Sequence, residues 1–89
     1  MSKTIDMELF LASVLIGSDA TRVRHLRQAR TIQSAISKRW IIDNPWNWKR
    51  KHLVWFLNYY TSANAPTTRY YYLLSVKILV LRLDKTWQF

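Results

Sequence analysis

The chain contains no cysteine, and its 89 residues include only one glycine and two prolines. Without cysteine it forms no disulfide and offers no thiolate to a substrate. Two histidines alone are also too few for the usual structural zinc clusters. All-β domains need many turn residues, so the scarcity of glycine and proline argues against that fold class. We expect an all-α protein without a metal or other cofactor.

Acidic residues are scarce as well. The chain has 5 Asp and Glu against 14 Lys and Arg, a net charge of +9. Such an imbalance bears on partners, and it favours nucleic acid, an acidic protein surface or an anionic membrane. Because 49% of the residues are hydrophobic and 15% are aromatic, a folded core is expected instead of disorder. The length predicts a single domain spanning residues 1–89.

Capping residues, glycine and proline divide the chain into four predicted helices that form a compact bundle. Their approximate ranges are 4–16, 20–40, 45–60 and 66–83, with N-caps at Ser2 or Thr4, at Ser18 or Asp19, and at Asn44, and with Pro66 opening the last helix. Gly17 is expected to end the first helix. Residues 70–83 would also suit a strand, but the sequence shows no second strand of similar strength to pair with it. Apolar residues surround nearly the whole of the fourth helix, which predicts a central position in the bundle or burial by a second copy.

Two features argue against a membrane location. Lys77 and Arg82 interrupt the apolar run of the fourth helix, which is shorter than the roughly 20 residues that a span needs. Asp6 and Glu8 precede the apolar residues of the first helix, whereas a signal peptide has a positive start. We therefore expect a cytoplasmic protein.

The residue types that carry catalysis are few. Four of the five carboxylates lie near predicted helix ends, where capping or the helix dipole explains them. His25 falls on the apolar face of the second helix and His52 in the middle of the third, so both are expected in or near the core. The sequence has neither a glycine-rich phosphate loop nor an HExxH pair. The sequence does not predict an enzyme.

The second helix carries the best candidate for an anion-binding surface. Arg24, Arg27, Arg30 and Lys38 fall on its polar side, with Thr31 and Ser34 between them. No acidic residue occurs between Asp19 and Asp43, although a merely solvated face normally mixes both signs. Arginines and hydroxyls commonly contact phosphate, so these cations are predicted to bind a nucleic-acid backbone. The alternative is an ordinary solvated face.

A second basic group opens the third helix, at Lys49, Arg50 and Lys51. On a helix, three consecutive residues spread over about 200°, so they do not form one patch. They are second-choice phosphate contacts.

Aromatic residues exceed what one core face needs. In a helix starting at Pro45, Trp46 falls on the apolar arc, while Trp48, His52, Trp55 and Tyr59 form a separate stripe. That stripe is expected to pack against the fourth helix, a second subunit or a stacked base. Tyr70, Tyr71 and Tyr72 point in three directions, so at least one is expected to face solvent beside Arg69. The predicted partner-binding residues are Trp48, Trp55, Tyr59, Arg69 and Tyr71.

The back half of the chain resembles the helical core-binding (SAM-like) domain of tyrosine recombinases. The resemblance is carried by the apolar helix end at 52–60, by Ser62 in the following loop, and by the threonine-opened, leucine-rich helix at 67–83. It implies a small bundle that holds DNA through its basic faces. It covers less than half of the chain and includes no catalytic residue, so recombinase activity is not implied.

Together these features predict a small DNA-binding or regulatory protein that contacts the phosphates of nucleic acid, most simply duplex DNA. The alternative is a non-enzymatic adaptor or inhibitor that docks on an acidic protein through its aromatic and basic faces. The surplus of apolar surface also predicts a homodimer through the third or fourth helix.

Overall fold

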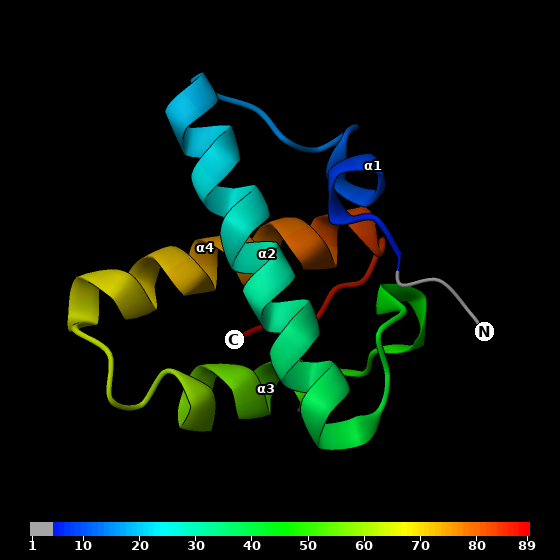
Figure 1. Cartoon of the computed structure of the whole chain (residues 1–89), viewed down its shortest axis with the longest axis vertical. Coiled ribbons are helices and arrows are strands. Elements are labelled where there is room, and N and C mark those ends of the chain that lie inside the picture. Colours follow the sequence, from blue (N-terminus) through cyan, green and yellow to red (C-terminus); the bar gives the residue numbers. More distant parts are fainter. Residues whose placement is uncertain (1–4) are drawn as a thin grey trace.

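In a computed structural model, residues 5–89 form an all-α bundle, which confirms the predicted fold class. Its α-helices are α1 (Met7–Leu11), α2 (Asp19–Trp40), α3 (Arg50–Trp55) and α4 (Pro66–Arg82) (Figure 1). A short 3-10 helix, η1 (Pro45–Asn47), precedes α3, and a π-helical turn, η2 (Phe56–Tyr60), follows it. The described residues contain no strand. The predicted caps Ser2 and Thr4 lie outside them.

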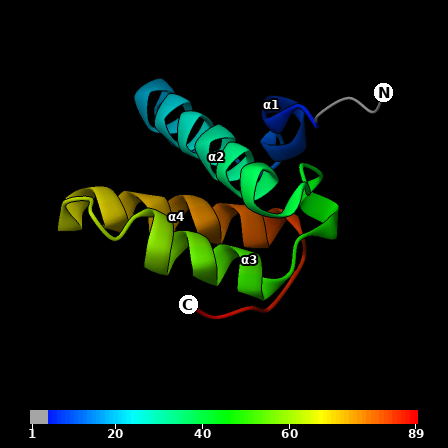
Figure 2. The same ribbon diagram turned by 60° about the horizontal axis from the view of Figure 1, so that its bottom comes forward.

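Helix α4 occupies the centre of the bundle. It lies between α2 and α3 (Figure 2), and it also contacts α1 and η2. Its buried residues are Ser75, Val76, Leu79 and Val80. Neighbours cover it on several sides, which agrees with a central position and explains most of its apolar character, although Leu81 is 64% exposed.

Helix α2 begins and ends where the sequence predicts. The Ser18 hydroxyl accepts a hydrogen bond from the Thr21 backbone N–H at 3.2 Å and so caps the first turn. Lys38 and Arg39 lie in the last turn, where cations are favourable for the helix dipole. The predicted apolar face is buried at its centre, with Ala29, Ile32 and Ile36 in the core.

Helix α1 is shorter than predicted. It ends at Leu11, and residues 12–14 form a turn, so the expected continuation to Ile16 is wrong. A further helical turn would need the Phe10 carbonyl to accept a bond from Val14. Instead, Arg82 Nε donates to that carbonyl at 2.6 Å, and the Val14 N–H bonds to the Leu11 carbonyl. A contact from α4 therefore replaces the next turn of α1.

The segment from Asn44 to Lys49 differs most from the prediction. Asn44 and Pro45 do start a helix, but it is the three-residue η1, and α3 begins only at Arg50. The extended residues Trp48 and Lys49 between them break the helical phase. As a result the predicted roles of two tryptophans are exchanged. Trp48 is 3% exposed in the core, whereas Trp46 is 50% exposed.

Ile41, the C-cap residue of α2, predicts a stabilising substitution. It has a left-handed backbone, φ 59°, although it is β-branched and 91% exposed. That conformation costs an L-residue about 1–2 kcal/mol, and glycine avoids the strain at some cost in chain entropy. Ile41→Gly is therefore expected to raise the free energy of unfolding by about 1 kcal/mol in urea titrations followed by circular dichroism.

The neighbouring residue provides the control. Ile42 packs partly buried against the core and does not have a positive φ, so Ile42→Gly is expected to lower stability. A loss of stability in Ile41→Gly would show that Ile41 is not strained.

Candidate nucleic-acid interface

The outer face of α2 carries a row of cations. Arg27, Arg30 and Lys38 are exposed, and exposed Ser34 lies among them at helical spacing. At 1.5 Å per residue the row, defined as these four side chains, is about 16 Å long. The Thr31 hydroxyl is engaged within the helix, because it donates to the Arg27 carbonyl at 3.2 Å. The structure thus brings three of the four predicted cations together on open surface.

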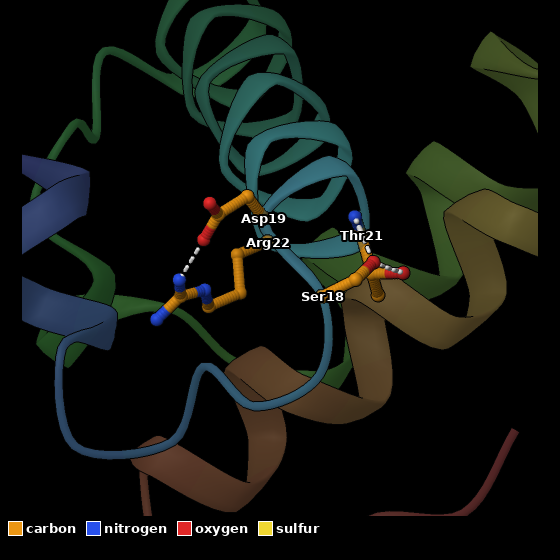
Figure 3. A network of polar contacts seen from close by, with 4 residues as sticks. All are labelled: Ser18, Asp19, Thr21 and Arg22. Atoms are coloured by element: carbon orange, nitrogen blue, oxygen red, sulfur yellow. Dashed lines mark hydrogen bonds and ion pairs between the residues drawn. The ribbon is translucent and has the colours of Figure 1, made fainter.

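Carboxylates lie at both ends of α2. In its first turn Asp19 pairs with Arg22 on one side of the helix, while Ser18 and Thr21 bond to each other on another side (Figure 3). After its last turn, Asp43 lines a shallow polar pocket of about 340 Å³ together with Arg30 and Lys38. Gln33 also lines that pocket and donates to the Asp43 carbonyl at 2.7 Å. Three of the four residues of the row, Arg30, Ser34 and Lys38, border this pocket.

Arg24 departs from the predicted row. Its guanidinium carbon lies 4.1 Å from the centre of the Tyr71 ring on α4, a cation–π distance. Its Nε is buried and has no hydrogen-bond partner within residues 5–89. The side chain therefore joins α2 to α4 and is half-buried, whereas the prediction had it wholly on the polar face. Tyr71, a predicted partner residue, is half-buried beneath it.

A buried polar cluster lies one turn further along both helices. Ser75 donates to Gln28 Oε1 at 2.7 Å, and His25 Nδ1 lies 2.8 Å from the same Ser75 hydroxyl. Because the hydroxyl proton goes to Gln28, the Nδ1–H of His25 is the donor in the second bond. All three side chains are buried, and each has a partner. The prediction of His25 as a core histidine is confirmed.

The second basic group lies at the start of α3, and its members have different surroundings. Lys49 and Lys51 are exposed. Arg50 holds the C-terminal segment, since its Nε and Nη2 donate to the Gln88 carbonyl at 3.0 and 2.8 Å. These cations lie at the N-terminal end of α3, which is the positive end of the helix dipole, so their position is unfavourable. No acidic residue in the first turn of α3 offsets their charge.

The aromatic stripe predicted for 48–59 does not form. Trp48 is in the core and donates its Nε1–H to the Ile42 carbonyl at 3.3 Å, so its predicted role as a partner-facing residue is wrong. Trp55 is half-buried with its ring centre 5.0 Å from that of Trp40, and Trp40 also contacts the His52 ring. Tyr59 alone of the predicted stripe is largely exposed, at 70%.

An open pocket of about 320 Å³ lies between η2 and the start of α4. Its lining residues are Leu57, Asn58, Thr61, Pro66, Arg69, Tyr70 and Leu73. Of these, the sequence predicted only Arg69 as a site residue, and it is exposed. Asn58 and Tyr70 were missed as site residues. The run of three tyrosines indicated that one ring would be exposed, but helical spacing alone did not predict which ring would line a pocket.

A larger groove of about 490 Å³ separates α1 from the first turns of α2. Apolar Leu15, Val23 and Leu26 line it, with Glu8 and Asp19 among the other lining residues. Asp19 and its partner Arg22 lie at the start of α2 (Figure 3). Glu8 and Asp19 make this groove a poor candidate for phosphate binding.

Comparisons with known proteins add no relative. No family model matches the chain, and neither the curated proteins nor the solved structures contain a match. The resemblance to recombinase core-binding domains therefore stays a prediction. Within residues 5–89, no helix is both long enough and apolar enough to cross a bilayer. The same residues contain no cluster of three or more potential metal ligands.

The two histidines predict a loss of stability in mild acid. Burial lowers the pKa of His25 below its usual value of 6.5, and Arg24 adds to the effect. Burial also lowers the pKa of His52, whose Nδ1 accepts the Lys49 N–H at 2.9 Å, and the charge of Lys51 adds to it. The unfolded chain therefore binds more protons than the folded one below about pH 6.5.

The free energy of unfolding is accordingly expected to be fully retained above about pH 6.5 and to fall as the pH drops through the lowered pKa values. Urea titrations between about pH 7.5 and 5.5 measure it. The double variant His25→Gln/His52→Gln should show a smaller pH dependence, whatever its stability at neutral pH. If the wild type were as stable at about pH 5.5 as at about pH 7.5, or more stable, the two histidines would not have lowered pKa values in the folded state.

Proposed function

We propose that this chain binds nucleic acid, most simply duplex DNA, through contacts between the phosphates and the outer face of α2. The observation that carries the proposal is the row of Arg27, Arg30, Ser34 and Lys38 on open surface. These side chains are the types that most often contact phosphate oxygens. The net charge of +9 supports the same partner by drawing the chain towards a polyanion.

The dimensions of the row support backbone contact. Its length of about 16 Å equals roughly five rises of 3.4 Å along the duplex axis, so the row is long enough to reach more than one phosphate of a strand. Guanidinium groups can hold a phosphate through two parallel hydrogen bonds, and the Ser34 hydroxyl can donate a third. Such contacts fix position on the backbone without reading sequence. The proposed activity is therefore binding that depends strongly on salt and weakly on sequence.

Other exposed cations extend the charged surface. Lys49 and Lys51 are open to solvent at the start of α3, at the helix end where acids are normally favoured. Arg50 is occupied by the Gln88 carbonyl and is less available than predicted. The two lysines are secondary contacts in this proposal.

Charge reversal on α2 tests the proposal. Arg27→Glu and Arg30→Glu each leave the buried face of α2 unchanged, and each is expected to weaken binding to a random duplex by roughly tenfold or more near physiological salt. The slope of log affinity against log salt should become shallower by about 1 for each phosphate that the variant no longer neutralises. Fluorescence anisotropy at several salt concentrations measures both quantities.

Lys77→Glu is the matched control. It makes the same change in net charge, but Lys77 lies on the exposed side of α4, two residues beyond the Ser75 that faces α2. It should weaken binding much less than Arg27→Glu. If all three variants bind alike, the row is not the interface, and salt-independent affinity of the wild type would exclude phosphate binding altogether.

A second candidate is docking on an acidic protein. Ile41 supports a protein partner, because a strained and 91% exposed aliphatic residue gives the isolated fold no benefit, and the net charge of +9 supports an acidic one. Tyr59 adds a second large exposed side chain. An interaction that survives nuclease treatment and is abolished in Ile41→Asn would favour this candidate over nucleic acid.

A further inference from the structure

We propose that the pocket beside Tyr70 receives an unpaired nucleobase, so that the preferred ligand carries a single-stranded segment next to its phosphate-bound part. The inference rests on the proposed function and deepens it by naming the ligand of a second subsite. The pocket, about 320 Å³ in volume, lies between η2 and the first turns of α4.

The lining of the pocket matches the chemistry of a nucleotide. The Tyr70 ring is 57% exposed and offers a flat aromatic face for stacking. The exposed guanidinium of Arg69 can pair with the attached phosphate, and Asn58 offers an amide donor and acceptor for a base edge. Leu57, Pro66 and Leu73 supply apolar surface. An aromatic face, a cation and a carboxamide in one pocket favour a nucleotide over a purely apolar ligand.

Packing against α2 holds the stacking surface in place. Tyr70 meets the Tyr71 ring edge to face, with ring centres 5.8 Å apart. Tyr71 in turn lies beneath the Arg24 guanidinium, whose Nε is buried. An exposed ring that is already ordered loses less entropy when a base stacks on it.

The same contacts connect the pocket with the basic row. Arg24 precedes Arg27 by three residues on α2, which is just under one helical turn. Arg24 touches Tyr71, and Tyr71 touches Tyr70 at the pocket. A strand that leaves the row at Arg27 would reach the pocket by passing Arg24 and Tyr71, and the sequence of α4 contains no carboxylate.

The π-helical turn forms the other wall. In η2 the Thr61 N–H bonds to the carbonyl of Phe56, five residues earlier, at 3.2 Å. The Thr61 hydroxyl donates to the Leu57 carbonyl at 2.6 Å, which fixes the wider turn. The extra residue in this turn shifts Asn58 relative to its place on a regular α-helix. Such turns occur often at functional sites.

The ligand must be unpaired to enter. A base within a duplex is stacked on both sides and paired at its edge, so neither its face nor its edge is free for Tyr70 or Asn58. A base in an overhang or gap is already unpaired, so little free energy is lost in freeing it for this contact. Stacking on an aromatic side chain contributes about 1–3 kcal/mol per base. This corresponds to about 5- to 150-fold in affinity.

Two ligands that differ only in a single-stranded overhang separate the contribution of the pocket to affinity from that of the row. A blunt duplex and the same duplex with an overhang of about five nucleotides are titrated by fluorescence anisotropy. Tyr70→Ala is expected to lose about 5- to 150-fold in affinity for the overhang ligand and less than about twofold for the blunt duplex. Tyr70→Phe keeps the aromatic face and should bind both like the wild type.

Phe89→Ala is the control, because Phe89 is also an exposed aromatic residue, at 38%, and does not line the pocket. It should leave both affinities unchanged. A second measurement uses the wild type alone: 2-aminopurine in the overhang should lose fluorescence on binding as it stacks. An unchanged fluorescence, or an equal reduction of affinity for the two ligands in Tyr70→Ala, would overturn the pocket proposal.

The failure of each proposal has a different signature. If Arg27→Glu lowers the affinity for both ligands but Tyr70→Ala does not lower the affinity for the overhang ligand more than that for the blunt duplex, phosphate binding stands and the base pocket is wrong. If the wild type binds neither ligand, both proposals are wrong.

Discussion

The crossing of α2 and α4 organises the remainder of the molecule. At its centre Ser75 bonds to both His25 and Gln28, from positions 50 and 47 residues away in the chain. A buried polar group left without a partner costs about 1–3 kcal/mol, so sliding either helix by one turn would be unfavourable. Apolar packing brings the two helices together, but these directional bonds select one register.

This register determines the surface on both sides of the crossing. One turn before Gln28 lies Arg24, and one turn before Ser75 lies Tyr71, so the crossing brings the guanidinium onto the ring. Tyr71 then supports Tyr70 at the pocket beside η2. The cations three and six residues beyond Arg24 remain on the outside of α2. A core contact thus arranges two neighbouring surfaces, one basic and one aromatic.

Several local features of the molecule are unfavourable for its stability. Lys49 and Lys51 lie at the positive end of α3, Ile41 has a left-handed backbone, and Arg24 Nε is buried without a partner among residues 5–89. Local departures from stable arrangements tend to collect where a protein meets its ligands. Arg24 and the two lysines all carry positive charge, which agrees with an anionic partner more readily than with an apolar one.

Local sequence was enough to predict the fold class, the ends of α2 and α4, and the chemical character of the α2 row. These follow from causes that act within one helix: Ser18 caps its own helix, Pro66 has a backbone suited to a first helical turn, and helical spacing alone places Arg27 and Arg30 together. Features that depend on a distant partner could not be predicted in this way.

Arg82 ends α1 early by binding a carbonyl 72 residues away in the chain, which no local pattern records. The break between η1 and α3 exchanged the predicted roles of Trp46 and Trp48, because one or two extended residues reset the helical phase. Arg24 left the polar face because an aromatic ring on α4 lay within reach. Capping and periodicity act over a few residues, whereas hydrogen bonds and ring contacts between helices are specified only once the chain has packed.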